Sequence, residues 1–188
     1  MWGRCTGLSL RRREAPGKFP RPRRRWRPCD GAVQSSGTVR GGPLLYFAYD
    51  ANIEPTRLAE VAPRAEFKFI AHLPEWRLHF PIPNGDGGLP SVKPESGNTV
   101  WGAVFAVPDE DLTSLNEHER GEGRTATSTQ AMDREGRRHD VVVHVCASEV
   151  NGEFNPERPY LEAMVAGSRH WKLPAGWVAN LEEHLEDL

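Results

Sequence analysis

The stretch Leu44–Ile53, with the sequence LLYFAYDANI, decides how the fold is interpreted. Its first residues are apolar and aromatic, which is typical of a buried strand. The run ends in Asp50, Ala51 and Asn52, and Glu54-Pro55-Thr56 then provides a helix start. A strand that ends in a tight turn before a helix leaves backbone N–H groups pointing in one direction, and such a turn can bind a carboxylate. The alternative is an ordinary strand–turn–helix corner that binds nothing.

Charge is distributed unevenly along the 188 residues. Residues 1–43 contain 11 Lys or Arg against two acidic residues, whereas residues 44–188 contain 13 basic and 24 acidic residues. The basic segment is also rich in proline and poor in apolar residues, so it cannot bury enough surface to fold, and we expect it to be disordered. Residues 44–188 are sufficient for one domain with its own core.

The basic segment 1–43 allows several interpretations. Its arginines and Trp26 could bind nucleic acid, because arginine neutralises phosphates and tryptophan stacks on bases. Its Arg-rich, acid-poor composition also occurs in organellar transit peptides, although its prolines interrupt any amphipathic helix. Translation assigned from too early a start, or an extension without specific function, would give the same composition. We do not expect nucleic acid as a partner, and we expect the segment to be dispensable for folding and activity.

Cysteine and hydropathy patterns exclude several classes of protein. Cys5, Cys29 and Cys146 are far apart, so the sequence offers neither a C-x-x-C zinc pair nor a disulfide framework. No apolar run reaches membrane-spanning length, and no signal-peptide core follows the basic start. We therefore expect a soluble, cytoplasmic protein that contacts no membrane. The sequence indicates no particular oligomeric state.

The periodicity of residues 44–188 predicts a mixture of strands and helices. Strands are predicted at 66–71, 76–80, 100–107, 125–132 and 138–146, and helices from Pro108-Asp109 and at 159–172 and 175–185. With the strand at Leu44, this makes roughly six or seven strands and few helices. The predicted fold class is α+β, as a small mixed β-barrel or strongly curled sheet with flanking helices.

The segment 115–121, with the sequence LNEHERG, contains the candidate acid–base groups. It is expected to end the short helix and turn toward the next strand. Glu117 and Glu119 would share a face in non-helical backbone and would diverge in a helix. A carboxylate held in such a turn can be desolvated, which raises its pKa and suits it as a base. The alternative is that Glu117, His118 and Glu119 are solvated surface residues.

Other groupings offer little chemistry. His144 and Cys146 would share one face of a strand, but such positions more often serve the core or the sheet. The glycine-rich turn at 85–88 lacks the Lys of a phosphate loop, and no G-x-S-x-G motif is present. The residues alone predict a small α+β domain with an anion-friendly turn and an acidic loop.

Several motifs, taken in order, resemble those of the gamma-glutamylcyclotransferase family. YFAYDANI at 46–53 resembles the family's opening Y-F-A-Y-G-S-N-L/M. The later matches are A-x-L-x-x-W-x-L-x-F at 71–80, GGL at 87–89, VWGAV at 100–104, L-x-x-L-N-E-x-E at 112–119, and Tyr160 followed by Ala166-Gly167. The resemblance covers about 130 residues, from Leu45 to about Pro174.

The resemblance implies an enzyme. In this family the α-amine of a γ-glutamyl group attacks its own γ-carbonyl, which releases an amine and forms 5-oxoproline without a cofactor or metal. The substrate implied is a γ-glutamyl amino acid, dipeptide or amine, as in glutathione-related metabolism, and the activity is of the lyase or transferase type. Glu119 matches the catalytic glutamate, a general acid/base. The matching substrate-binding positions are Tyr46, Phe47, Ala48, Tyr49, Asp50, Ala51, Asn52 and Tyr160.

The chain departs from the family pattern within the site. Asp50 stands where the family has Gly, Ala51 stands where it often has Ser, and residues 123–126 lack a common aromatic residue. Because Asp tolerates left-handed backbone, we expect the turn to survive. A carboxylate beside a carboxylate site is repulsive unless it points outward or meets the substrate's ammonium. An alternative function therefore stays open: a non-catalytic member of the same fold that binds small acids or other proteins.

Overall fold

The computed structural model describes residues 43–85, 87–148 and 152–188. The expectations for the basic segment, apart from Pro43, lie outside the described residues. No helix in the described ranges is long and apolar enough to cross a membrane.

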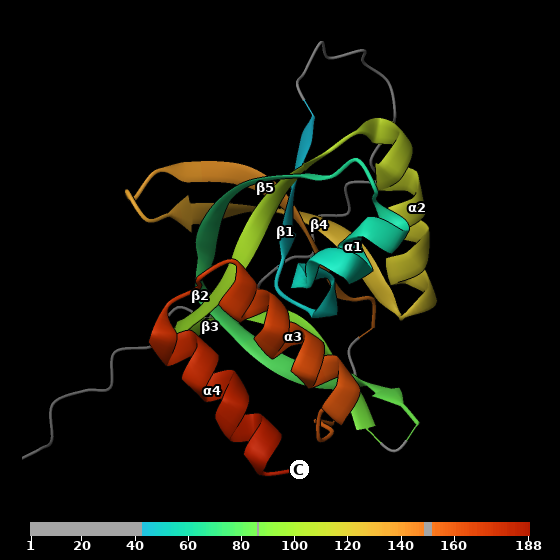
Figure 1. The fold of residues 1–188 in the computed structure, drawn as a ribbon. Coiled ribbons are helices and arrows are strands. Elements are labelled where there is room, and N and C mark those ends of the chain that lie inside the picture. The colour runs from blue at the N-terminus through green and yellow to red at the C-terminus, as the bar shows by residue number, and fades with distance from the viewer. Residues whose placement is uncertain (1–42, 86, 149–151) are drawn as a thin grey trace, which may run out of the picture. The chain divides into compact units, whose positions relative to one another are not determined.

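The strands of the described ranges form a closed barrel in the order β1-β3-β2-β4-β5, seen from the side in Figure 1. Their bounds are Leu44–Ala48 (β1), Glu66–Asn84 (β2), Gly87–Val107 (β3), Arg124–Asp133 (β4) and Arg138–Cys146 (β5). β1 pairs antiparallel with β3 and parallel with β5, which makes the barrel mixed. The predicted α+β class is confirmed, and of its two forms the barrel is the one found.

Helices cover the barrel on its outside and at one end (Figure 1). α3 lies against both η1 and α4, and α1 lies against α2. The bounds are Ala51–Ile53 for the short 3₁₀ helix η1, Pro55–Val61 (α1), Asp109–Gly121 (α2), Arg158–His170 (α3) and Ala175–Glu186 (α4).

The prediction of six or seven strands is wrong, because the strands are fewer and longer. The segments expected at 66–71 and 76–80 belong to the single strand β2, and the strand expected at 100–107 begins at Gly87. The register of β2 against β3 shifts between Pro74 and Trp76, where Glu75 has a φ of 62°. Such irregularities interrupt the alternation of side chains while the strand pairing continues.

The turn after β1 is held rigidly by α3. A Cβ atom on Gly167 of α3 would lie 2.6 Å from the backbone carbonyl carbon of Ile53, so the close packing of this helix on η1 requires glycine. Trp171 Nε1 donates a hydrogen bond to the Ile53 carbonyl at 2.7 Å. The backbone of η1 is therefore fixed from a distant part of the chain.

Candidate functional site

Glu119 lies at the centre of a buried polar cluster. Its side chain is fully buried, Asn52 Nδ2 donates to its Oε1 at 2.6 Å, and Arg124 Nε donates to its Oε2 at 2.5 Å. Burial raises the pKa of Glu119, and the guanidinium of Arg124 opposes that rise. The turn after β1, the end of α2 and the start of β4 thus meet at one carboxylate.

The helical backbone explains why Glu119 is buried and its acidic neighbour is not. α2 ends at Gly121, so the segment 115–121 ends the helix as expected, but it is helical throughout and the turn toward β4 follows it. Asp111, Leu115 and Glu119 are the buried residues of α2 and recur every four positions on its inward face. Glu117, two positions earlier, diverges from Glu119 and is exposed.

Arg124 is the cluster residue that no sequence motif assigned to the site. It is the first residue of β4, and its side chain is fully buried. Nη1 donates to the Pro90 carbonyl at 3.0 Å, and Nη2 donates to Tyr160 Oη at 2.9 Å and to Glu122 Oε2. A signal existed in the sequence, because Arg124 lies in the segment 123–126 that departs from the family pattern, and its charge is opposite to that of Asp50.

Asp50 completes what we call the Arg124 cluster, which consists of Asp50, Glu119, Glu122, Arg124 and Tyr160. Asp50 Oδ2 lies 3.1 Å from Arg124 Nη2, and both side chains are buried. Asp50 therefore neither points outward nor depends on a substrate ammonium, because an internal guanidinium neutralises it. Its backbone is extended, with φ −93° and ψ −159°, so the turn forms without the left-handed conformation that Asp tolerates.

The oxygens beside Nη2 of Arg124 outnumber the hydrogens that this nitrogen carries. Nη2 carries two N–H bonds, and Glu122 Oε2, Tyr160 Oη and Asp50 Oδ2 all lie beside it. Asp50 Oδ2 consequently lies within ion-pair distance but accepts no aligned hydrogen bond. Burial, together with repulsion by Glu119, raises the pKa of Asp50 to about 7 despite Arg124. The cluster therefore carries an excess of negative charge above neutral pH, which favours a cationic group of a ligand.

The backbone of the turn is occupied by the turn itself. Asp50 Oδ1 accepts the Asn52 N–H at 3.0 Å, and the Asp50 carbonyl accepts the Ile53 N–H at 3.0 Å. The Glu54 N–H donates to the Ala51 carbonyl at 3.1 Å. The side chain of Asp50 thus satisfies one of the donors that were expected to bind a ligand carboxylate.

The remaining predicted positions of β1 lie behind the cluster. Tyr46 is buried with its ring 5.5 Å from that of His144, and Tyr49 Oη donates to the His144 carbonyl at 2.7 Å. Phe47 and Ala48 are fully buried in the hydrophobic core. Of the predicted residues, the structure brings Asp50, Asn52, Glu119 and Tyr160 together, while Tyr46, Phe47, Ala48, Tyr49 and Ala51 form the packing behind them.

His144 and Cys146 do not form a reactive pair. His144 Nε2 lies 2.7 Å from Asn116 Oδ1, and burial lowers the pKa of His144 to about 4. The neutral imidazole therefore donates to the amide oxygen. Cys146 Sγ lies 3.1 Å from the Ser148 carbonyl. Both residues thus have structural partners, and the strand pattern had favoured a structural role for them over a reactive one.

A cavity of about 300 Å³ leads to the cluster from the surface. We call it the entrance cavity. Asn52, Glu122 and Tyr160 line it on the cluster side, and each contacts Glu119 or Arg124 behind the wall. The other lining residues are Arg57, Glu60, Val61 and His118. This volume is at the small end of the range for small-molecule sites.

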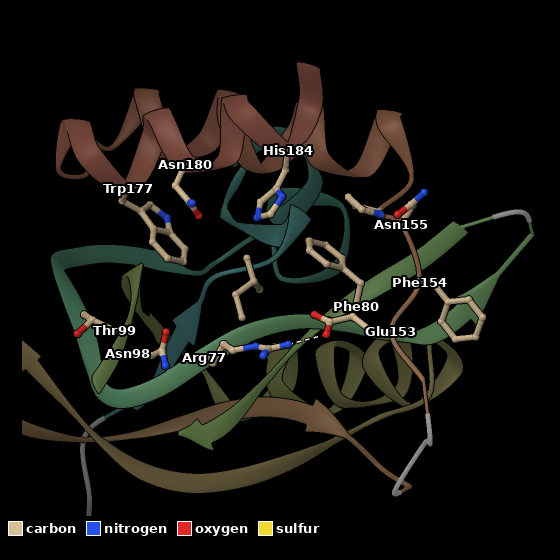
Figure 2. A pocket seen from close by; sticks show the side chains of 12 residues that line it. Arg77, Phe80, Asn98, Thr99, Glu153, Phe154, Asn155, Trp177, Asn180 and His184 are labelled. Atoms are coloured by element: carbon tan, nitrogen blue, oxygen red, sulfur yellow. Dashed lines mark hydrogen bonds and ion pairs between the residues drawn. The ribbon is translucent and has the colours of Figure 1, made fainter. Parts of the chain in front are cut away.

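A larger cavity of about 610 Å³ lies between α4 and the β2–β3 ribbon. Figure 2 shows Trp177, Asn180 and His184 extending from α4 toward the strand that carries Arg77. Arg77 Nη2 is paired with Glu153 Oε2 at 2.5 Å, and the Glu153 side chain is half exposed. This cavity contains no member of the Arg124 cluster. Glu122 and Tyr160 of the cluster line the entrance cavity, and Arg124 lines a further cavity of about 310 Å³ together with Asn116 and Arg120.

Within residues 43–85, 87–148 and 152–188, no three His, Cys, Asp or Glu residues are placed to hold a metal ion. The carboxylates of the cluster surround a guanidinium, which takes the place that a cation would occupy.

Residues 46–170 match the family described as "Gamma-glutamyl cyclotransferase, AIG2-like", and the chain belongs to this family. The matched residues include every member of the Arg124 cluster. The family assignment made from the motifs is thereby confirmed.

Relatives match over part of their length. The chain is 33% identical to gamma-glutamylcyclotransferase of Bos taurus over 85 residues, which cover 42% of this chain and 45% of the bovine protein. It is 33% identical to the Homo sapiens protein of the same name over 82 residues, covering 40% and 44% of the two chains. The chain thus spans less than half the length of these relatives.

A solved structure described as gamma-glutamyl cyclotransferase has the same fold. It superposes with a TM-score of 0.69 at 22% identity, over 74% of this chain and 86% of the other. At this identity the likeness concerns the fold alone.

Proposed function

We propose that this protein is a cofactor-independent cyclotransferase that converts a γ-glutamyl amino acid, dipeptide or amine into 5-oxoproline and a free amine. The observation that carries the proposal is a fully buried Glu119, held by Asn52 and Arg124 directly behind the entrance cavity. Family membership supports the reaction class. The proposal retains the expectation of a cytoplasmic enzyme.

Glu119 is the proposed acid–base group. The substrate's ammonium enters a cluster with excess negative charge and donates its proton to Glu119. Because burial raises the pKa of Glu119, the carboxylate is a stronger base than an exposed glutamate. The two hydrogen bonds from Asn52 and Arg124 leave lone pairs on both carboxylate oxygens for the ammonium.

The neutral α-amine then attacks the γ-carbonyl carbon, and a five-membered ring closes. Because the amine and the carbonyl belong to one substrate molecule, binding the γ-glutamyl group in a folded conformation removes much of the entropic part of the activation barrier. Asn52 Nδ2 uses one N–H on Glu119, and its second N–H can donate to the developing oxyanion. Glu119 returns its proton to the leaving nitrogen as the carbon–nitrogen bond breaks, which regenerates the carboxylate. The second proton that the ring nitrogen loses passes to the released amine, which departs as an ammonium.

The test is 5-oxoproline formation from a panel of γ-glutamyl amino acids, dipeptides and amines. Glu119→Gln keeps the size and one acceptor of the side chain but removes the base, and we expect kcat to fall by a factor of about 10² to 10⁴. Glu117→Gln is the matched control, because it makes the same change on the exposed face of α2. The melting temperature of each variant separates loss of catalysis from loss of fold.

If the wild type forms no 5-oxoproline from any member of the panel, the enzymatic proposal fails. It also fails if Glu119→Gln and Glu117→Gln have equal activity. The alternative is a non-catalytic protein that binds small acids, and one observation favours it: a permanent cation already occupies the inner side of Glu119. That alternative predicts binding of 5-oxoproline or a related acid without turnover.

A further inference from the structure

We propose that Arg124 Nη2 and Tyr160 Oη form the subsite for a ligand's α-carboxylate, and that Glu122 occupies this subsite in the free protein. The identity of the ligand as a γ-glutamyl compound rests on the proposed function, whereas the subsite and its occupation by Glu122 do not.

Glu122 is the replaceable partner of Arg124. The side chains of Asp50 and Glu119 are at most 1% exposed, and each is also fixed by Asn52, Asp50 through the backbone N–H and Glu119 through Nδ2. The Glu122 side chain is 24% exposed and lines the entrance cavity. A ligand entering that cavity therefore meets Glu122 before it meets Arg124.

The contacts of Glu122 are those that a bound carboxylate would make. One oxygen, Oε2, accepts from both Arg124 Nη2 and Tyr160 Oη, the latter at 2.9 Å. A charged acceptor on a buried guanidinium and a tyrosine hydroxyl is a typical carboxylate site. The Asn52 N–H is taken by Asp50, so Arg124 and Tyr160 offer a ligand anion donors that this backbone group does not.

Glu122 can leave without dismantling the cluster. It follows the last residue of α2 and precedes Gly123, which has a φ of 81° and thus a backbone conformation that suits glycine. The other carboxylate oxygen, Oε1, faces His118 Nε2 at 3.8 Å, toward the exposed side of the helix. A displaced Glu122 therefore has a polar neighbour outside the subsite, while its departure frees Tyr160 Oη to donate to the ligand.

The ligand also preserves the charge balance. Exchange of the Glu122 carboxylate for a ligand carboxylate leaves the charge around Arg124 unchanged, and the ligand's ammonium adds a positive charge beside Glu119. The displacement opens the wall of the entrance cavity at Arg124, the direct neighbour of Glu119.

The experiment is calorimetric titration of the full-length protein with 5-oxoproline, and with 2-pyrrolidone as the same lactam without a carboxylate. We expect Glu122→Gln to bind 5-oxoproline about tenfold more tightly than the wild type. The ligand then no longer competes with the charge-assisted hydrogen bond between Glu122 and Arg124. Glu122→Ala should bind more tightly still. Neither substitution should alter the affinity for 2-pyrrolidone by the same factor.

Glu60→Gln is the matched control. Glu60 lines the same cavity and carries the same charge, but it does not contact Arg124. If Glu122 acted only through the electrostatic field, the two substitutions would have similar effects. We expect Glu60→Gln to change the affinity by less than about twofold, because solvent screens an exposed charge.

Equal effects of Glu60→Gln and Glu122→Gln would overturn the proposal, as would unchanged or weaker binding of 5-oxoproline to both Glu122 variants. Absence of 5-oxoproline binding to every form would also overturn it. Tighter binding to the Glu122 variants without turnover by the wild type supports the subsite while the cyclotransferase proposal fails. Turnover with no effect of Glu122 on binding supports the cyclotransferase proposal while the subsite proposal fails.

Discussion

Two clusters of carboxylates and arginine in this molecule contain the same groups in different surroundings. In the Arg124 cluster, three carboxylates share one buried guanidinium. In the hairpin between β4 and β5, Arg137 pairs with two carboxylates, Asp133 through Nε at 2.8 Å and Glu135 through Nη2 at 3.1 Å. The carboxylate of Asp133 also accepts from the Glu135 and Arg137 N–H groups at 3.0 and 2.9 Å. His139 Nε2 lies 2.8 Å from the same carboxylate.

The pKa values of the two aspartates move in opposite directions. Burial raises the pKa of Asp133, but hydrogen bonds from His139 and Arg137 outweigh it and hold the value well below the usual range. Burial raises the pKa of Asp50 to about 7, and the shared Arg124 does not reverse it. The number of donors per carboxylate therefore decides the outcome more than the presence of an arginine. The hairpin is a satisfied surface turn, whereas the Arg124 cluster retains unmet charge that a ligand can use.

The largest expected effect is that of removing the shared guanidinium. Arg124→Met leaves Asp50 and Glu119 buried without a cation, and we expect the free energy of unfolding to fall by about 4 kcal/mol. Arg137→Met makes the same change in the hairpin, where the side chain is 69% exposed, and should stay within the range of ordinary surface substitutions. Urea denaturation at neutral pH measures both.

An equal decrease in the free energy of unfolding for Arg124→Met and Arg137→Met would show that burial does not distinguish the two clusters. Tryptophan fluorescence and circular dichroism, followed together, should give coincident transitions for each variant. A change in the urea m-value would indicate an altered denatured state instead of a local effect.

The second effect concerns the coupling between Asp50 and Arg124. Because each neutralises the other, adding Asp50→Gly to Arg124→Met should recover about 2 kcal/mol of the stability that Arg124→Met loses. The backbone of Asp50 is extended, so glycine is not needed for its conformation, and glycine costs little as a helix N-cap. Asp50→Gly alone should destabilise the protein. Additive free energies in the double-mutant cycle would mean that Asp50 and Arg124 act independently.

Local patterns in the sequence predicted the fold class and the helices, and its motifs predicted the family. These patterns failed to predict the full length of β2 and β3, because bulges interrupt the alternation of side chains there. Each strand nevertheless continues, since it is paired with its neighbour. The helix containing Glu119 is longer than expected, because its charged end is held by tertiary packing that no local signal reports.

The motifs named Asp50, Asn52, Glu119 and Tyr160 as candidate site residues, and the structure brings these four together. No motif named Arg124. Arg124 was missed because a charged residue in sequence is more often exposed than buried. Its burial depends on Asp50, which is 74 residues away along the chain, and on a carbonyl of β3. Only the closure of the barrel brings these groups together.

The smallest effect is a pH dependence of stability that separates the two aspartates. A pKa of about 7 for Asp50 exceeds its ordinary value, so the folded state binds more protons than the unfolded state between these values. The contribution of Asp50 to stability is therefore present at low pH and is lost as the pH rises through about 7. We expect the wild type to lose about 1 kcal/mol relative to Asp50→Asn between about pH 6 and 7.

Asp133→Asn provides the contrast for this measurement. The pKa of Asp133 is lowered, so its contribution is present above the ordinary aspartate value and is lost only as the pH falls below it. Asp133 is thus ionised in both the folded and the unfolded states between about pH 6 and 7, and Asp133→Asn should retain the slope of the wild type there. Urea denaturation at closely spaced pH values measures both slopes. A wild-type slope that survives Asp50→Asn would place the titrating proton elsewhere in the cluster, on Glu119, whose pKa burial also raises.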